Sequence, residues 1–76
     1  MRIRGVMLGW RRNEKGYRVV DIEGLLVDAG KNGVADSVLE SLVGQEVEAI
    51  VQVHWNRSQD GKPFARRRML AIRPVD

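Results

Sequence analysis

The chain has 76 residues, a net charge of +3, one histidine and no cysteine. That length allows a single domain, residues 1–76, with a small hydrophobic core. The composition excludes a disulfide framework and a thiolate metal site, and one histidine argues against a multi-histidine site. Because no apolar run approaches the roughly 20 residues of a membrane span, and the N-terminus does not resemble a signal peptide, we expect a cytoplasmic protein with no membrane partner, metal or cofactor.

The charges are strongly segregated along the chain. Residues 1–18 hold six basic side chains against one acidic, residues 19–54 hold one against seven, and residues 55–73 hold six against one. Ten of the thirteen basic residues are arginine, which pairs with phosphates and stacks on bases. This distribution favours an oriented polyanionic partner, although basic outward faces of strands would also account for it.

The first 30 residues predict three strands separated by glycine-containing turns. Residues 2–12 alternate with apolar side chains on both faces, as in a curved strand, and the turn "NEKG" follows. A second strand is expected over residues 17–24, with Val20 and Ile22 pointing inward. Residues 25–30, "LLVDAG", form a short third strand.

Residues 31–45 contain the only predicted helix. Asp36 or Ser37 is a suitable N-cap, and Ser37 with Glu40 matches a capping box. Gly44 is placed for a left-handed C-terminal cap. An apolar stripe at helical spacing is formed by Val34, Val38, Leu39, Leu42 and Val43. The helix is short, so we expect packing against the sheet to stabilise it.

The last 31 residues predict two long strands. Residues 46–55 alternate strictly, residues 56–63 form a loop with an Asp-Gly turn, and residues 64–74 form the final strand. The inward row of the fourth strand would be Val47, Ala49, Val51, Val53 and Trp55. On the fifth strand Leu70 and Ile72 are expected in the core. The same face continues with Phe64, Arg66 and Arg68, or a bulge shifts it.

The order of these elements is typical of one fold class. Three strands, a helix and two strands predict a mainly β protein that resembles the OB-fold, a five-stranded Greek-key barrel with one short helix between strands 3 and 4. The resemblance rests on element order, length and glycine placement. It implies that the loops of residues 11–16 and 56–63 flank one ligand-binding groove.

All four aromatic residues lie beside these two loops, among basic residues. Arginine and lysine neutralise phosphates, and aromatic rings stack on unpaired bases, so this mixture indicates single-stranded nucleic acid. The candidate binding residues are Trp10, Arg11, Arg12, Lys15, Tyr17, Arg18, Trp55, Arg57, Lys62, Phe64, Arg66 and Arg68. Either tryptophan could instead belong to the core, and Trp55 is in phase with the apolar row of its strand.

The stretch "GKPFARRRMLAI" resembles the last hairpin of small bacterial and phage single-stranded-DNA-binding OB proteins, in which a "GK" turn precedes an aromatic and a basic strand. This resemblance implies largely sequence-independent binding of single-stranded DNA. The chain lacks the acidic C-terminal tail of the usual bacterial version.

Two other functions are compatible with the same pattern. One is RNA binding, as in domains resembling translation initiation factor one or the S1 repeats. The other is a protein–protein assembly module with basic edges, and a homodimer is possible. No paired carboxylates, activated serine or phosphate-binding glycine loop indicates an enzyme.

Overall fold

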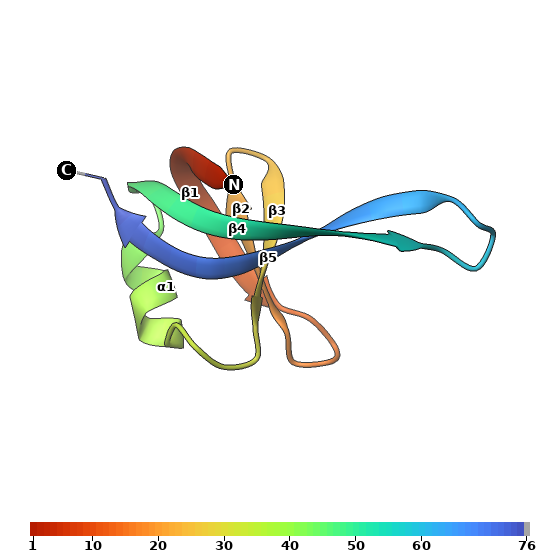
Figure 1. The fold of residues 1–76 in the computed structure, drawn as a ribbon. Helices are drawn as coiled ribbons and strands as arrows, with labels where there is room; N and C mark the ends of the chain where they lie inside the picture. The colour runs from red at the N-terminus through yellow and green to blue at the C-terminus, as the bar shows by residue number, and fades with distance from the viewer. Residues whose placement is uncertain (76) are drawn as a thin grey trace.

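A computed structural model describes residues 1–75 and contains one five-stranded sheet that closes on itself in a ring (Figure 1). The elements are β1 (Arg2–Arg12), β2 (Arg18–Ile22), β3 (Leu25–Gly30), α1 (Asp36–Leu42), β4 (Glu46–Arg57) and β5 (Pro63–Pro74). The strand order is β1-β2-β3-β5-β4, and β4 pairs with β1 to complete the ring. Only β3 and β5 pair in parallel. The mainly β class and the order of elements are confirmed.

The inside of the ring is filled by alternate residues of the strands and by α1. The buried apolar residues are Met7, Val20, Ile22, Val27, Ala29, Leu39, Leu42, Val47, Ala49, Val51 and Met69. Fully burying a side chain the size of valine or leucine stabilises the fold by about 1.5–3 kcal/mol. Val20 and Ile22 are among these buried residues, so their predicted inward positions are confirmed. Leu39 of α1 has no exposed surface and holds the helix against the ring.

A β-bulge changes the inward residues of β5. The pairing of β4 with β5 shifts after Ile50, so that Val51 lies opposite Met69. Leu70 is the extra residue and is 59% exposed, so its predicted place in the core is wrong. Met69 takes that place because a bulge turns the following side chains to the other face. Ile72 packs against the core as expected.

Beyond the ring, β4 and β5 continue as a two-stranded projection (Figure 1). We call residues 52–68 the arm. It contributes to the elongated shape of the molecule, whose extents are 42 × 25 × 19 Å. Trp55 lies in the arm and is 71% exposed, so the alternative that its strand phase makes it a core residue is wrong. The alternation of apolar residues in β4 continues past Val51, but Val51 is the last residue of this strand that lies inside the ring.

The N-terminus of α1 differs from the predicted capping box. Ala35 is the N-cap residue and no side chain caps the helix. Ser37 and Glu40 do not form the box, because the Glu40 carboxylate accepts a hydrogen bond from Trp10 Nε1 at 2.8 Å. Asp36 is likewise bonded to side chains outside the helix. Both carboxylates join α1 to β1 or β2 instead of capping α1.

The C-terminus of α1 agrees better with the sequence. Gly44 has a φ of +84°, so the predicted left-handed residue is confirmed. Its backbone N–H donates to the Met7 carbonyl of β1 at 2.7 Å and not to a carbonyl of α1, whose C-cap residue is Val43. The helix itself is short, and Val38 and Val43 are exposed. The apolar stripe is thus narrower than predicted, because a helix of this length reaches the core mainly through Leu39 and Leu42.

Candidate functional site

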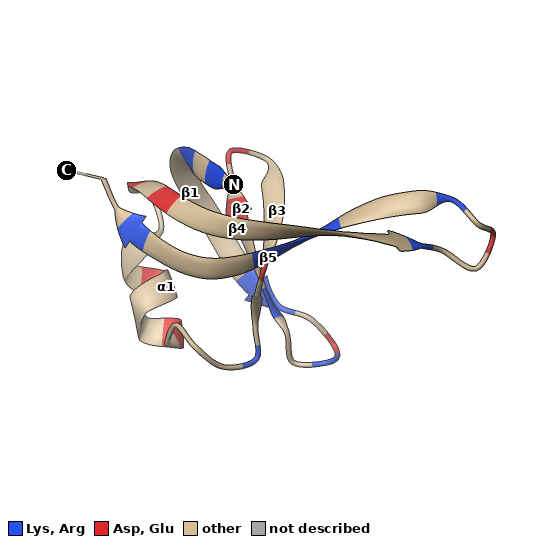
Figure 2. Cartoon of the chain, viewed as in Figure 1, with Lys and Arg blue, Asp and Glu red and all other residues tan. Residues whose placement is uncertain are grey.

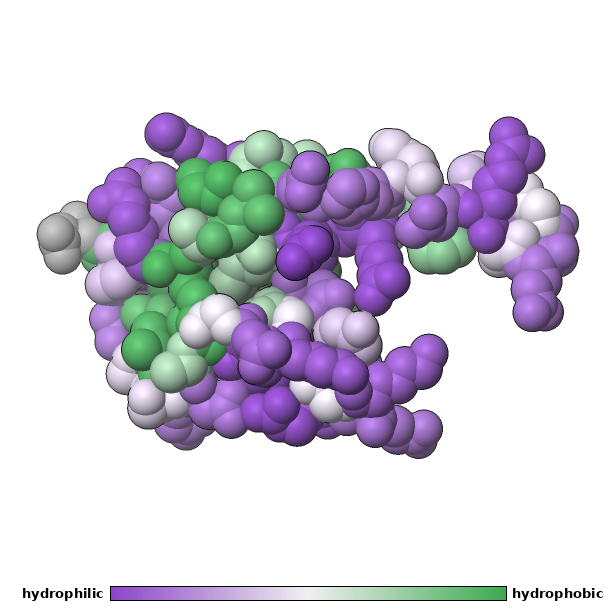
Figure 3. Space-filling model, turned by 60° about the horizontal axis from the view of Figure 1, so that its bottom comes forward, coloured by the Kyte–Doolittle hydropathy of each residue, from purple (hydrophilic) through white to green (hydrophobic). Residues whose placement is uncertain are grey.

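A groove lies between the arm and two loops of the ring. One hollow of about 710 Å³ separates the arm from the β3–α1 loop, and an adjoining hollow of about 770 Å³ lies over the β1–β2 loop. Tyr17 and Arg66 line both hollows, so the two form one groove. Figure 3 shows two hydrophilic projections on the right of the molecule with an open notch between them. The two basic segments of the sequence therefore border one groove.

The groove carries several basic side chains, and Figure 2 shows basic positions on the β1–β2 loop, the β3–α1 loop and the arm. The residues concerned are Arg11, Arg12, Lys15, Lys31, Arg66 and Arg68. Within residues 1–75, only two of these are in ion pairs: Arg12 with Asp36 at 2.6 Å and Arg66 with Asp28 at 3.3 Å. The other four present charge to solvent or to a ligand.

The arginine triplet and the arm aromatics are divided between two faces. In the β4–β5 register His54 lies opposite Arg66, and Asn56 opposite Phe64. The first face therefore holds Gln52, His54, Asn56, Phe64, Arg66 and Arg68. Four of its residues line the hollow beside the β3–α1 loop: His54, Asn56, Arg66 and Arg68. The predicted common face of Phe64, Arg66 and Arg68 is confirmed.

The four aromatic residues have different environments. Tyr17 is half-buried in the groove, with Lys31 Nζ 5.0 Å from its ring centroid, while Phe64 and Trp55 are 44% and 71% exposed. Trp10 packs against the core and its indole N–H is bonded to Glu40. Phe64 and Trp55 thus offer exposed rings, the Tyr17 ring is partly covered and has Lys31 over it, and Trp10 mainly connects β1 to α1.

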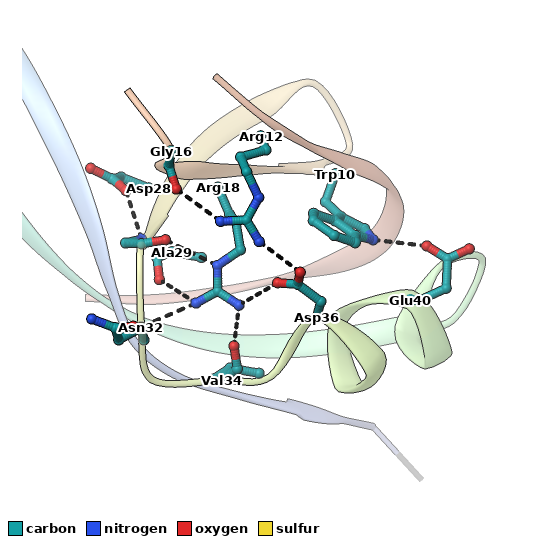
Figure 4. A network of polar contacts seen from close by, with 11 residues as sticks. Trp10, Arg12, Gly16, Arg18, Asp28, Ala29, Asn32, Val34, Asp36 and Glu40 are labelled. Carbon is teal, nitrogen blue, oxygen red and sulfur yellow. Dashed lines mark hydrogen bonds and ion pairs between the residues drawn. The ribbon is translucent and has the colours of Figure 1, made fainter. Parts of the chain in front are cut away.

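Arg18 does not face the groove, although its position in a basic segment predicted that it would. It is 2% exposed, and its guanidinium donates hydrogen bonds to backbone carbonyls of the β3–α1 loop region and to Asp36 (Figure 4). The accepting carbonyls belong to Ala29, Gly30, Asn32 and Val34. A buried charge requires such complete pairing. Arg18 therefore fixes the loop that borders the groove.

Asp36 connects this buried arginine to the groove surface. Its two carboxylate oxygens accept hydrogen bonds from Arg18 at 3.0 Å and from Arg12 at 2.6 Å. The hydrogen bond from Arg18, followed by that from Arg12, holds the pKa of Asp36 below its ordinary value. Arg12 also donates to the Gly16 carbonyl at 3.0 Å. The β1–β2 loop is thereby held in place on one side of the groove.

The candidate residues thus fall into three groups. The groove brings together Arg11, Arg12, Lys15, Tyr17, Arg66 and Arg68. The outer arm holds Trp55, Arg57, Lys62 and Phe64, which do not line these two hollows. Trp10 and Arg18 are engaged in the fold.

In the hollow beside the β3–α1 loop, sequence reasoning missed five polar residues: Asp28, Lys31, Asn32, His54 and Asn56. Lys31 had one available signal, because it is the single basic residue between positions 19 and 54 and follows the glycine that ends β3. Asp28 had no such signal. Its carboxylate accepts the neighbouring Gly30 N–H at 2.7 Å and pairs with Arg66, and the second of these contacts depends on the β3–β5 pairing.

In residues 1–75 no group of three or more histidine, cysteine or acidic side chains is arranged to hold a metal ion. No helix in the same range has the length and apolar character needed to cross a membrane. Comparisons of the chain with models of protein families, with curated proteins and with solved structures found no match.

Proposed function

We propose that the chain is a non-catalytic OB-fold protein that binds single-stranded DNA with little sequence specificity. The observation that carries the proposal is the groove: two basic segments distant in sequence border it, and Tyr17 and Arg66 line both of its hollows. The ring order β1-β2-β3-β5-β4, with α1 between β3 and β4, supports the fold assignment.

Phosphates are bound in this proposal by the basic side chains along the groove. Arg11, Lys15, Lys31 and Arg68 are exposed and without an ion pair within residues 1–75, so each is available to a phosphate. Neutralising phosphates releases counterions, which makes the affinity fall steeply with salt. Because these contacts are made to the backbone, they carry no sequence preference.

Bases are bound by stacking on the exposed rings. Tyr17 in the groove and Phe64 on the arm provide surfaces that every base can use, and each stack contributes about 1–3 kcal/mol. In a duplex the base faces are covered by neighbouring pairs. The rings therefore favour single strands, and the exposed amides of Asn32 and Asn56 add adaptable hydrogen bonds.

A fluorescence titration with oligo-dT tests this proposal. Binding is expected to raise the fluorescence anisotropy of a label on the oligo-dT, and added salt should reverse the rise. A duplex of the same length should bind more weakly, and a matched RNA strand measures the DNA preference. Absence of binding to both DNA and RNA at low salt would refute the proposal.

Two arginines of β5 provide a matched pair of variants. Arg66 and Arg73 are both exposed and each pairs with a carboxylate, Asp28 or Glu48, but only Arg66 lines the groove. Arg66→Gln is expected to weaken binding and to reduce the number of released counterions by about one. Arg73→Gln should leave the titration unchanged, and equal effects of the two variants would argue against the groove.

A further inference from the structure

The arm has a second face that does not line the groove. Residues that lie opposite one another in an antiparallel pair share a face, and the β4–β5 register contains no shift between Val51 and Arg57. Trp55 lies opposite Ala65, and Val53 opposite Arg67. Trp55 and Phe64 therefore project from opposite faces of the same hairpin, and each is exposed.

The second face is also basic. It holds Arg57 and Arg67, and neither has an ion pair within residues 1–75. Since adjacent residues of a strand alternate in direction, Arg67 points away from the face shared by Arg66 and Arg68. The acidic residue of the arm is Asp60 at its tip, which accepts a hydrogen bond from Ser58.

A shallow surface of the ring continues from this second face. Ala65 and Arg67 line a hollow of about 250 Å³ together with Val19 and Leu26 of β2 and β3. Val19 and Leu26 also line a hollow of about 400 Å³ that reaches Arg11, a residue of the groove. The second face of the arm is thus connected over β2 and β3 to the β1–β2 loop.

From these observations we infer that the Trp55 face of the arm is a second binding surface for single-stranded nucleic acid. A long strand occupies the groove and passes around the arm onto Trp55, Arg57 and Arg67, whereas a short strand occupies the groove alone. The inference rests on the proposed function. A second copy of the chain is a poorer occupant of this arm face, because apposing two such faces would bring four arginines together. The adjoining ring surface does carry Asp21 and Asp28, but Asp28 is already paired with Arg66.

The experiment compares face-matched variants on labelled oligo-dT of two lengths, about 8 and about 30 nucleotides, chosen to fit and to exceed the site of one OB domain. Fluorescence anisotropy of the label is the readout, so loss of tryptophan does not affect it. Trp55→Ala and Arg67→Gln alter the second face, and Phe64→Ala and Arg68→Gln alter the first. Circular dichroism and thermal unfolding confirm that all four variants remain folded.

Trp55→Ala is expected to weaken binding of the long strand at least about fivefold, the lower limit of a lost stack, and to leave the short strand unchanged. Arg67→Gln should do the same to a smaller degree. The first-face variants should weaken both lengths.

Equal effects of Trp55→Ala on both lengths, or no effect on either, would overturn the inference while leaving the proposed function intact. A change of oligomeric state on sizing, without a change in binding, would overturn it in favour of a second copy. Failure of the unaltered chain to bind any strand would instead remove the proposed function itself.

Discussion

The ring and the arm share β4 and β5 but differ in what covers these two strands. In the ring, Val47, Ala49 and Val51 of β4 are buried beneath other strands and α1. In the arm the same strand continues to alternate, yet Trp55 is mostly exposed because no second layer covers the hairpin. A two-stranded hairpin has little stability of its own, so the arm depends on the ring for its order.

This difference separates stability from binding. Inward side chains of the ring, together with Arg18, are committed to the core or to internal hydrogen bonds, whereas those of the arm and of the groove are available to a ligand. Substitutions of the first kind should therefore change the free energy of unfolding, and those of the second kind should change affinity. Four changes test this separation.

The largest expected effect is that of Arg18→Met. The variant removes the guanidinium that bonds Asp36 and the carbonyls of the β3–α1 loop region. The four carbonyls lose this partner, while Asp36 keeps its hydrogen bond from Arg12. Breaking a buried charged network costs about 3–5 kcal/mol. Urea unfolding measures it. Arg68→Met, at an exposed groove position, should stay within about 0.5 kcal/mol. A loss in Arg18→Met as small as that expected for Arg68→Met would mean that Arg18 is not a structural residue.

Excising the outer arm is expected to affect binding more than folding. Asn-Gly in place of residues 55–65 would join His54 to Arg66, which lie opposite one another, through a two-residue turn. The ring keeps its core. The affinity for oligo-dT should fall at least about tenfold, because the variant lacks the rings of Trp55 and Phe64 and the charges of Arg57 and Lys62. Unfolding of this variant, or unchanged affinity, would contradict the division between ring and arm.

Asp28→Asn is expected to increase affinity. The substitution releases Arg66 from its ion pair and removes a negative charge from the groove. An exposed pair is worth about 0.2–1 kcal/mol, so the gain should be a few-fold at low salt. Asp60→Asn is the control of equal charge change, since Asp60 lies at the arm tip outside the two hollows of the groove. A larger gain from Asp60→Asn would show that net charge, not the groove, governs affinity.

The smallest expected effect is a change in the free energy of unfolding at low pH. The pKa of Asp36 is lowered in the folded chain, mainly by the hydrogen bond from Arg18, so its carboxylate stabilises the fold above about pH 4. That contribution is lost as the pH falls from there through the lowered pKa. The free energy of unfolding, measured with urea between pH 7 and 2.5, should therefore depend less on pH below pH 4 for Asp36→Asn than for the unaltered chain. An equally steep curve would assign the acid sensitivity to other groups.

The alternation of apolar residues was enough to predict all five strands and the position of α1, because the periods of strand and helix differ. It could not locate the end of the ring. Trp55 continues the phase of Val51, and only the three-dimensional closure leaves one buried and the other exposed. Leu70 was misplaced for a related reason, since a bulge in the β4–β5 ladder has no clear signature in the residues around it.

The candidate site was predictable where its residues are close to the two turns. The basic and aromatic composition of those turns identified Tyr17 and Arg66, which line both hollows. It also suggested Arg18, whose burial depends on carbonyls of residues 29–34 that no local pattern places around it. Composition thus identified the segments, and long-range contacts decided which side chains are free.

The backbone of Met1 has a practical consequence for handling the protein. Its amino group donates to the Val51 carbonyl at 3.0 Å, and its own carbonyl accepts the Val51 N–H at 2.8 Å. Since β1 runs antiparallel to β4, residues fused ahead of Met1 would extend along β4 toward the unpaired backbone edge of the arm. β5 ends opposite Val47, at the far end of the hairpin from the arm. Affinity tags therefore belong at the C-terminus, and a titration of both tagged forms would reveal interference from an N-terminal one.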